Sequence, residues 1–345
     1  MRRPLQNGER PRSWGFWTEV KLDALGRYLP QFTRASRRAQ ATLYLDLFAG
    51  SVDNVRRDDE GRQFFGSTVR ALDTEPGFTR LRFFELGPNA DRLRQQLRDR
   101  YPDDDRFDVI NGDCNKEIAG CLSGLSDDGL DWAPTFCFVD PDGLDVDWPT
   151  LRALAQFKNS SARTKAEMLI LLPHTSIPRL AGWDNAMGVD DRLSAKITSL
   201  FGADSWRAID DRRQSNDLTA SEARHLYLSL FRFKLERELG YRKTLTIEMG
   251  NEQGIPVYVL VFATDHPAGD RIMSSVFRQA REQSAEYRAE LRERRQRERD
   301  ERAGLQSLFG ADELAEEAAP VYMETTELSG SAELPDWLLH RIERD

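Results

Sequence analysis

The feature that most constrains this chain is a short apolar run that ends in an acid and a small-residue turn. Residues 43–54 read LYLDLFAGSVDN, so a buried strand would end near Asp46 and be followed by Phe48, Ala49 and Gly50. Small residues after a parallel strand let the backbone approach a bound nucleotide closely. The run therefore predicts the first strand and the ligand loop of a nucleotide-binding α/β sheet.

One residue of this loop departs from the usual pattern. Val52 stands where such loops usually carry another glycine. A β-branched side chain resists positive φ and would occupy space beside a ligand. Two alternatives follow: a displaced loop that still binds its ligand, or a site given up for a partner.

Four more apolar runs follow, and amphipathic helical patterns separate them. The runs are residues 81–86, 107–110, 135–139 and 167–172. The helical patterns are residues 67–73, 90–100, 117–125 and 150–157. Strands that alternate with helices predict a parallel sheet with right-handed crossovers. Residues 243–249 and 257–263 then predict an antiparallel hairpin. An α/β fold with a mostly parallel sheet ending in such a hairpin is expected of a Rossmann-like class I methyltransferase.

The predicted organisation places this sheet between two charged ends. The parts are a basic segment at 1–16, the sheet domain at 17–268 with a helical insert at about 174–220, a long charged helix at 269–303 and a tail at 304–345. The domain should open with a lead-in helix that ends near Pro30, and residues 56–66 should form a Gly/Asp-rich loop. The acidic tail should be mostly disordered.

Composition argues against several classes of protein. No run approaches the roughly 18 apolar residues of a membrane helix, and no apolar segment follows the basic N-terminus. We therefore expect no membrane insertion and a cytoplasmic location. Three cysteines without paired spacing and four scattered histidines predict neither a disulfide framework nor a metal site.

The charge distribution leaves contact with nucleic acid open. The formal net charge is −9, and residues 311–345 carry ten acids against two arginines, so the rest of the chain is near neutral. Residues 270–302 interleave ten arginines with eight acids. Such a helix is either a solvated, ion-paired helix or an arm that binds RNA or a protein partner.

Acidic residues follow three successive predicted strands. Asp46, Glu85 and Asp113 would share one edge of a parallel sheet. Asp46 can orient the loop or accept from a ligand ammonium group, Glu85 can accept from both ribose hydroxyls, and Asp113 can accept from an adenine amine. Each acid alone is equally typical of a helix cap or turn. Together they predict a cofactor site formed by Asp46, Phe48, Ala49, Gly50, Glu85, Asp113 and Cys114.

A fourth acid, Asp140, precedes Pro141 at the end of the strand expected beside the first. Proline offers no N–H, so oxygens there could accept hydrogen bonds from a substrate amine, and we assign Asp140 and Pro141 to catalysis. The pair is similar to the Asp/Asn-Pro-Pro-aromatic motif of amino-methyltransferases. Asp142 and Gly143 replace its second proline and its aromatic ring, so a simple strand-end turn is the alternative.

Several motifs in this order resemble one family. They are DLFAG at 46–50, Gly66-Ser67, FFE at 83–85, Gly112-Asp113 with Asn115, FVDPDG at 138–143 and YVLVFATDH at 258–266. Over residues 17–280 the chain resembles the three-Cys-motif partner (TcmP) proteins. The resemblance implies a bacterial or phage-associated, methyltransferase-like Rossmann protein encoded beside a separate protein that supplies the three cysteines.

Three functional hypotheses follow. The first is a methyltransferase that uses S-adenosylmethionine and acts with the three-Cys-motif protein, with nucleic acid as one candidate substrate. The second is a catalytically inactive Rossmann-fold partner or binding protein. The third is RNA or DNA binding, with or without catalysis.

Overall fold

The chain has a mixed α/β fold built on a mostly parallel seven-stranded sheet and a smaller three-stranded sheet. A computed structural model describes residues 13–56, 62–159, 164–173, 177, 191–250, 256–302 and 332–344. The fold divides into two compact units, Met1–Ile170 and Leu171–Asp345. The boundary falls inside strand β8, and the sheet domain expected for residues 17–268 remains a prediction.

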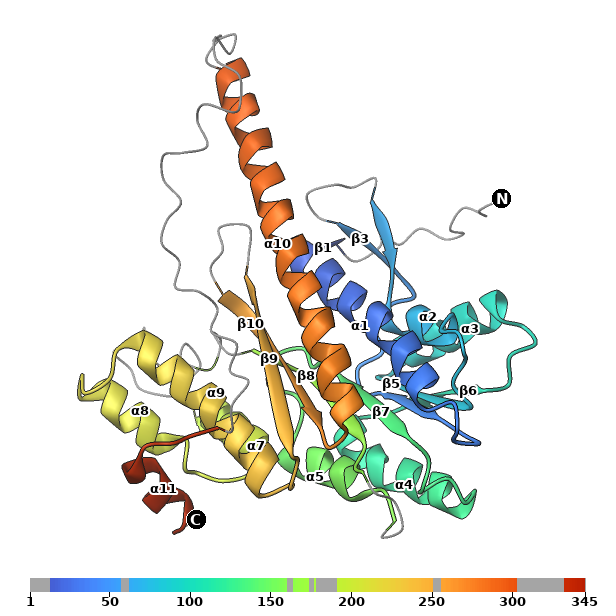
Figure 1. Cartoon of the computed structure of the whole chain (residues 1–345), viewed down its shortest axis with the longest axis horizontal. Coiled ribbons are helices and arrows are strands. Elements are labelled where there is room, and N and C mark those ends of the chain that lie inside the picture. Colours follow the sequence, from blue (N-terminus) through green and yellow to red (C-terminus); the bar gives the residue numbers. More distant parts are fainter. Residues whose placement is uncertain are drawn as a thin grey trace. The chain divides into compact units, whose positions relative to one another are not determined.

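The strands of the large sheet lie in the order β6-β5-β2-β7-β8-β10-β9 (Figure 1). They are β2 (Leu43–Asp46), β5 (Arg80–Glu85), β6 (Phe107–Asn111), β7 (Thr135–Val139), β8 (Glu167–Leu172), β9 (Lys243–Gly250) and β10 (Pro256–Thr264). The pairs β2–β5, β2–β7, β5–β6 and β7–β8 are parallel, whereas β9 and β10 are antiparallel. The expected parallel strands and the expected hairpin are confirmed.

The described part of the first unit contains five helices. They are α1 (Phe16–Ala35), α2 (Ser67–Leu72), α3 (Pro88–Arg100), α4 (Cys114–Asp127) and α5 (Trp148–Gln156). Aromatic side chains join α1 to the sheet: Tyr28 packs on Phe136 with ring centroids 5.3 Å apart, and Phe32 stacks on Phe78 at 5.9 Å. These rings are buried, so they form the apolar core that fixes α1 against the sheet.

The lead-in helix is longer than predicted. We expected it to end near Pro30, but α1 continues to Ala35 with Pro30 inside it. Proline removes one helical hydrogen bond, which usually ends or kinks a helix. Phe32 and Thr33 beyond it are both buried, and the Thr33 hydroxyl donates to the carbonyls of Leu29 and Pro30. Packing of the last turn therefore outweighs the local preference.

The predicted loop at 56–66 is also different. Strands β1 (Ser13–Trp14), β3 (Asp53–Arg56) and β4 (Gln63–Phe65) form a second sheet in the order β1-β3-β4, and residues 57–61 lie outside the described part. Strands β3 and β4 are antiparallel, and Glu19 of α1 forms ion pairs with the residues at their connected ends. Its carboxylate lies 3.3 Å from Arg56 and 2.7 Å from Arg62. Two arginines thus neutralise a buried acid of α1, a tertiary contact that a loop-like composition does not reveal.

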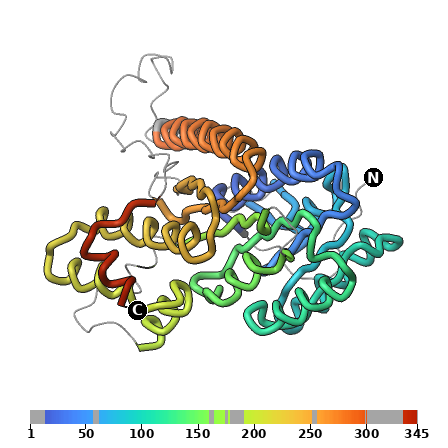
Figure 2. Tube along the Cα trace, turned by 60° about the horizontal axis from the view of Figure 1, so that its bottom comes forward, coloured from blue at the N-terminus to red at the C-terminus, as the bar shows by residue number. Residues whose placement is uncertain are grey.

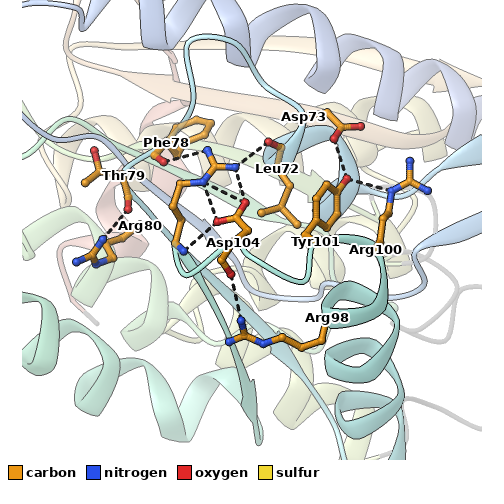
Figure 3. Close-up of polar contacts among 10 residues, drawn as sticks. Leu72, Asp73, Phe78, Thr79, Arg80, Arg98, Arg100, Tyr101 and Asp104 are labelled. Carbon is orange, nitrogen blue, oxygen red and sulfur yellow. Dashed lines mark hydrogen bonds and ion pairs between the residues drawn. The ribbon is translucent and has the colours of Figure 1, made fainter.

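The amino-terminal edge of the large sheet is closed by polar contacts (Figure 3). Arg106 donates from Nη2 to Asp104 at 2.6 Å and to the carbonyl of Leu72 at 3.2 Å, and from Nη1 to the carbonyl of Phe78 at 3.4 Å. The side-chain hydrogen bonds from Arg106 to Asp104 lower the pKa of the Asp104 carboxyl. The cluster ties the end of α2 to the starts of β5 and β6, so this edge has a structural role.

The second unit contains the remaining described helices. They are α7 (Asp191–Phe201), α8 (Arg207–Gln214), α9 (Ala220–Arg237), α10 (Pro267–Arg302) and α11 (Asp336–Ile342). Of the expected insert at 174–220, residues 174–176 and 178–190 lie outside the described part. The long charged helix α10 runs without a break (Figures 1 and 2), with its apolar anchors Met273, Val276 and Phe277 buried.

The end of the chain differs from the disordered tail that we expected. Residues 332–344 fold onto the helices of the second unit and include α11 (Figure 2). The Ala332 N–H donates to Glu236 at 3.0 Å, and Leu334 and Leu338 are buried. The sequence is acidic overall, but its leucines and Trp337 supply an apolar face for docking. Residues 303–331 lie outside the described part of the chain.

Candidate functional site

The candidate site lies at the carboxyl edge of the first unit's strands. From β2 the chain turns to β5 and β6 on one side and later returns to β7 on the other, so the strand order reverses between β2 and β7. Open α/β sheets bind ligands at the carboxyl edge of this switch point. Asp46 pairs in register with Phe83 and Phe138, which places Glu85 at the end of β5 and Asp140 directly after β7.

Hydrogen bonds hold the loop that follows β2 over this edge. The N–H of Leu47 donates to the carbonyl of Phe138 at 3.0 Å, and the N–H of Ala49 donates to that of Phe84 at 2.9 Å. The loop is thus tied to both neighbouring strands. Gly50 has a φ of 65°, a conformation that disfavours any side chain.

A second glycine lets the loop pass α2 closely. A Cβ at Gly66 would lie 2.1 Å from the carbonyl oxygen of Ser51, and the N–H of Gly66 donates to the carbonyl of Val52 at 2.8 Å. Within the described chain, Asn216 is the one non-glycine residue with positive φ, so Val52 does not adopt it. Val52 is buried and directly precedes β3. Because its φ is not positive, no glycine is required at this position.

Asp46 is sealed inside the protein. Its side chain is 0% exposed, and it accepts from the Tyr44 hydroxyl at 3.2 Å and from the Phe48 N–H at 3.4 Å. Burial and, to a lesser extent, the charge of Asp140 raise the pKa of the Asp46 carboxyl to about 7, against the opposing effect of hydrogen bonds that include one from Ser67. Of its two predicted roles, this geometry suits orientation of the loop.

Glu85 joins the loop to β5 and keeps capacity for a ligand. Its Oε2 accepts from the Gly50 N–H at 2.8 Å and its Oε1 accepts from the Leu86 N–H at 2.9 Å. A carboxylate oxygen can accept two hydrogen bonds, so each oxygen retains a free lone pair beyond these contacts. A pair of adjacent hydroxyl groups is a suitable donor for both oxygens.

Leu86 is a residue that the sequence reasoning missed. Its side chain is 59% exposed, directly after Glu85 and before Gly87, whose φ is 53°. An exposed leucine beside a polar crevice offers an apolar surface to a flat ligand ring. The signal was present in the sequence, because an apolar residue follows the acid and precedes a Gly-Pro pair.

Asp113 caps α4. Its carboxylate accepts from the Asn115 N–H at 3.0 Å, which is the helix N-cap contact, and Lys116 lies 4.0 Å away. Cys114 is buried in the first helical turn, where burial raises the pKa of its thiol to about 12. The cap is one of the two alternatives for Asp113, and the adenine contact predicted for Asp113 and Cys114 remains a prediction.

Asp140 is paired with a lysine that the sequence reasoning also missed as a site residue. The Nζ of Lys21 lies 2.5 Å from Oδ2 of Asp140, and both side chains are largely buried at 10% and 19% exposure. Lys21, Leu25 and Tyr28 share one face of α1, so a helical projection indicates an inward lysine that needs an acidic partner. Pro141 is buried beside the pair.

Asn115 fixes the segment that follows Asp140. Its side-chain amide donates to the carbonyl of Asp145 at 2.8 Å, and its Oδ1 accepts from the Asp147 N–H at 3.0 Å and the Thr150 hydroxyl at 2.7 Å. The start of α4 is therefore tied to the turn after β7. This brace positions the loops on either side of the crevice.

The described residues contain neither a metal-binding cluster nor a membrane-spanning helix. That part of the chain holds no group of three or more His, Cys, Asp or Glu side chains placed to bind a metal ion. None of its helices is both long and apolar enough to cross a membrane.

No family model matches the chain, and no curated protein matches it. One similar solved structure is protein LPL1258 from Legionella pneumophila str. Philadelphia 1, described by the family model DUF519. The match covers 73% of this chain and 86% of the Legionella protein, with 11% sequence identity and a TM-score of 0.42. Similarity at this level transfers neither fold family nor function to this chain.

Proposed function

We propose that this chain is a methyltransferase that uses S-adenosylmethionine and acts with a separately encoded three-Cys-motif protein. The observation that carries the proposal is the Glu85 carboxylate, held on the Gly50 loop beside the switch point with lone pairs to spare. Nucleic acid is one candidate substrate.

The strand order supports the proposal. Numbered along the chain within the sheet, the order is 3-2-1-4-5-7-6. This is the doubly wound order 3-2-1-4-5-6 with one more strand inserted between the fifth and the sixth. The inserted strand, β10, runs antiparallel to β9. This is the arrangement expected of a class I methyltransferase.

The residues at the crevice fit most of the cofactor. Glu85 would accept from the ribose hydroxyls, the backbone of Ala49 and Gly50 would approach the ligand, and Leu86 would contact the base. Asp46 does not fit a direct contact with the ligand ammonium group, because it is fully buried. When bound, S-adenosylmethionine supplies an electrophilic methyl group on a sulfonium.

Methyl transfer depends on in-line placement of the nucleophile more than on acid–base chemistry. Asp140 and Lys21 lie at the end of β7, where a substrate amine would be held. One Asp140 oxygen contacts Lys21, and the remaining lone pairs of the carboxylate can accept from such an amine. Lys21 would therefore position the Asp140 carboxylate that holds the substrate amine.

A binding role without catalysis is the second candidate. The Lys21–Asp140 ion pair favours it, because a pair this buried also serves simply to fix α1 on the sheet. Such a protein would still associate with the three-Cys-motif protein after its crevice is altered.

The melting temperature with saturating S-adenosylmethionine or S-adenosylhomocysteine tests the first proposal, because a ligand that binds the folded state stabilises it. We expect a rise of several degrees that Glu85→Gln removes. Asp108→Asn, an exposed substitution on the adjacent strand β6, should keep it. No rise with either compound would refute cofactor binding. Co-purification with the three-Cys-motif protein that survives Glu85→Gln would then favour the second candidate.

A further inference from the structure

The second unit contains a hollow that the proposed methyltransferase site does not use. Residues of α8 and of the C-terminal segment that includes α11 line it, and its volume is about 390 Å³. Pockets of roughly 300–1,000 Å³ accommodate small ligands. Its lining residues are Ala208, Asp211, Arg212, Trp337, His340, Arg341 and Arg344.

The lining is strongly basic. Arg212 of α8 and Arg341 and Arg344 of the C-terminal segment bring three guanidinium groups to one hollow, against the single carboxylate of Asp211. The nearby Asp204 accepts from the Thr198 hydroxyl and from Arg207 at 2.9 Å, and these hydrogen bonds, with the charges of Arg207 and Arg341, lower the pKa of its carboxyl. The three guanidinium groups still outnumber the carboxylates of Asp211 and Asp204. The hollow is therefore suited to an anion.

An aromatic ring lies among these charges. The guanidinium of Arg212 lies over the Trp337 ring, 4.4 Å from its centroid. The His340 Nδ1 lies 2.7 Å from the Asp336 carbonyl oxygen, which can only accept, so Nδ1 carries the proton and Nε2 is left for another contact. Guanidinium groups beside an aromatic ring are typical of sites that hold phosphates and bases together.

The wall formed by α11 is firmly attached. Leu338 is fully buried, Leu334 is 8% exposed, and the Ala332 N–H donates to Glu236. Glu236 in turn accepts from the Thr244 hydroxyl at 2.6 Å, and Thr244 accepts from the buried Arg232 at 2.9 Å. These contacts fix α11 to the rest of the second unit, so the hollow is part of the folded structure.

We propose that the hollow between α8 and α11 binds the phosphate of a nucleotide unit, either a free nucleoside monophosphate or one residue of a single-stranded nucleic acid. Guanidinium groups match phosphate oxygens with paired hydrogen bonds, and a phosphate has enough oxygens to engage more than one of them. A peptide carboxylate has only two oxygens, so it would engage fewer of the three guanidinium groups than a phosphate would. The inference does not depend on the proposed methyltransferase activity.

Fluorescence anisotropy of the full-length chain with a labelled single-stranded oligonucleotide tests this site. Arg341→Ala/Arg344→Ala removes two exposed guanidinium groups, and Arg292→Ala/Arg295→Ala removes two exposed arginines of equal spacing on α10. We expect the first variant to weaken binding at least about tenfold and to lower the salt slope by about 2. The α10 control should change affinity less than about twofold on the same electrostatic argument.

Competition with adenosine monophosphate identifies the source of the phosphate. Displacement of the oligonucleotide indicates a free nucleotide site, and its absence indicates a strand site; both support the inference. Equal weakening by the two double variants, or binding of a polyglutamate peptide but not of the oligonucleotide, would overturn it. If the double variant melts early, Arg344→Ala alone provides the measurement, since Arg344 lies beyond the last helical residue. Cofactor stabilisation should be unchanged in these variants, so the two proposals fail separately.

Discussion

The Nζ of Lys21 lies 2.5 Å from Oδ2 of Asp140, and this ion pair joins the first helix to the end of β7 at the switch point of the sheet. Asp140 also acts on its neighbour, because its charge adds to the burial that raises the pKa of Asp46 to about 7. The crevice is therefore built on two acids of different character. One is ion-paired, and the other is sealed and partly protonated at neutral pH.

Asp46→Asn should stabilise the protein at high pH. The folded-state pKa of Asp46 is raised above its unfolded value of 3.8, so the wild type loses stability as pH rises from about 4 to above 7, where the buried group ionises. At about 1.4 kcal/mol per pKa unit, the difference should be on the order of 2–4 kcal/mol. Urea unfolding of both proteins at pH 5 and pH 8 checks this. If the unfolding free energies of the wild type and Asp46→Asn differ by the same amount at pH 5 and pH 8, the raised pKa of Asp46 is contradicted.

The Lys21–Asp140 pair should show strong coupling in a double-mutant cycle. Lys21→Met leaves a largely buried carboxylate without its cation and should cost about 3 kcal/mol of unfolding free energy. Lys21→Met/Asp140→Asn removes both charges and should be less destabilised than the sum of the single variants by at least about 1 kcal/mol. Additive effects in chemical denaturation would show that the two groups do not interact.

Gly66→Ala should displace the ligand loop. The added Cβ would lie 2.1 Å from the Ser51 backbone oxygen, so the loop must move at a cost of about 1–3 kcal/mol. Gly120→Ala is the matched control: Gly120 lies inside α4 with no atom within 4 Å of an added Cβ, and it should stabilise the helix by up to about 1 kcal/mol. Melting temperatures that shift in the same direction for both variants would contradict this account of the loop.

Strands β2, β7 and β8 could be predicted because each is buried on both faces and so forms an apolar run, and β5 and β6 because their buried positions are apolar. The placement of Glu85 and Asp140 at one edge followed, since parallel strands align their carboxyl ends. The small β1-β3-β4 sheet could not be predicted, because it depends on Glu19, whose arginine partners lie about 40 residues away. The pairing of Lys21 with Asp140 spans 119 residues, and no local pattern specifies it.

The docked end of the chain gives a fourth prediction. Leu338 is fully buried, so Leu338→Ala should cost roughly 2 kcal/mol or more and should release residues 332–344 to protease. Leu339→Ala, at a half-buried neighbouring position, should have a smaller effect. Limited proteolysis followed by mass spectrometry measures both. Cleavage in this segment at equal rates in the wild type and both variants would show that the segment is not anchored.

The most direct test of the proposed function is calorimetric titration of the purified full-length chain with S-adenosylmethionine. The arrangement of Glu85 on the Gly50 loop predicts binding at one site. Because Glu85→Gln halves the charge-assisted acceptor capacity, it should weaken affinity at least about tenfold, whereas Asp108→Asn should leave it within about twofold. Absence of binding by the wild type, or equal affinity of the Glu85→Gln variant, would contradict the account.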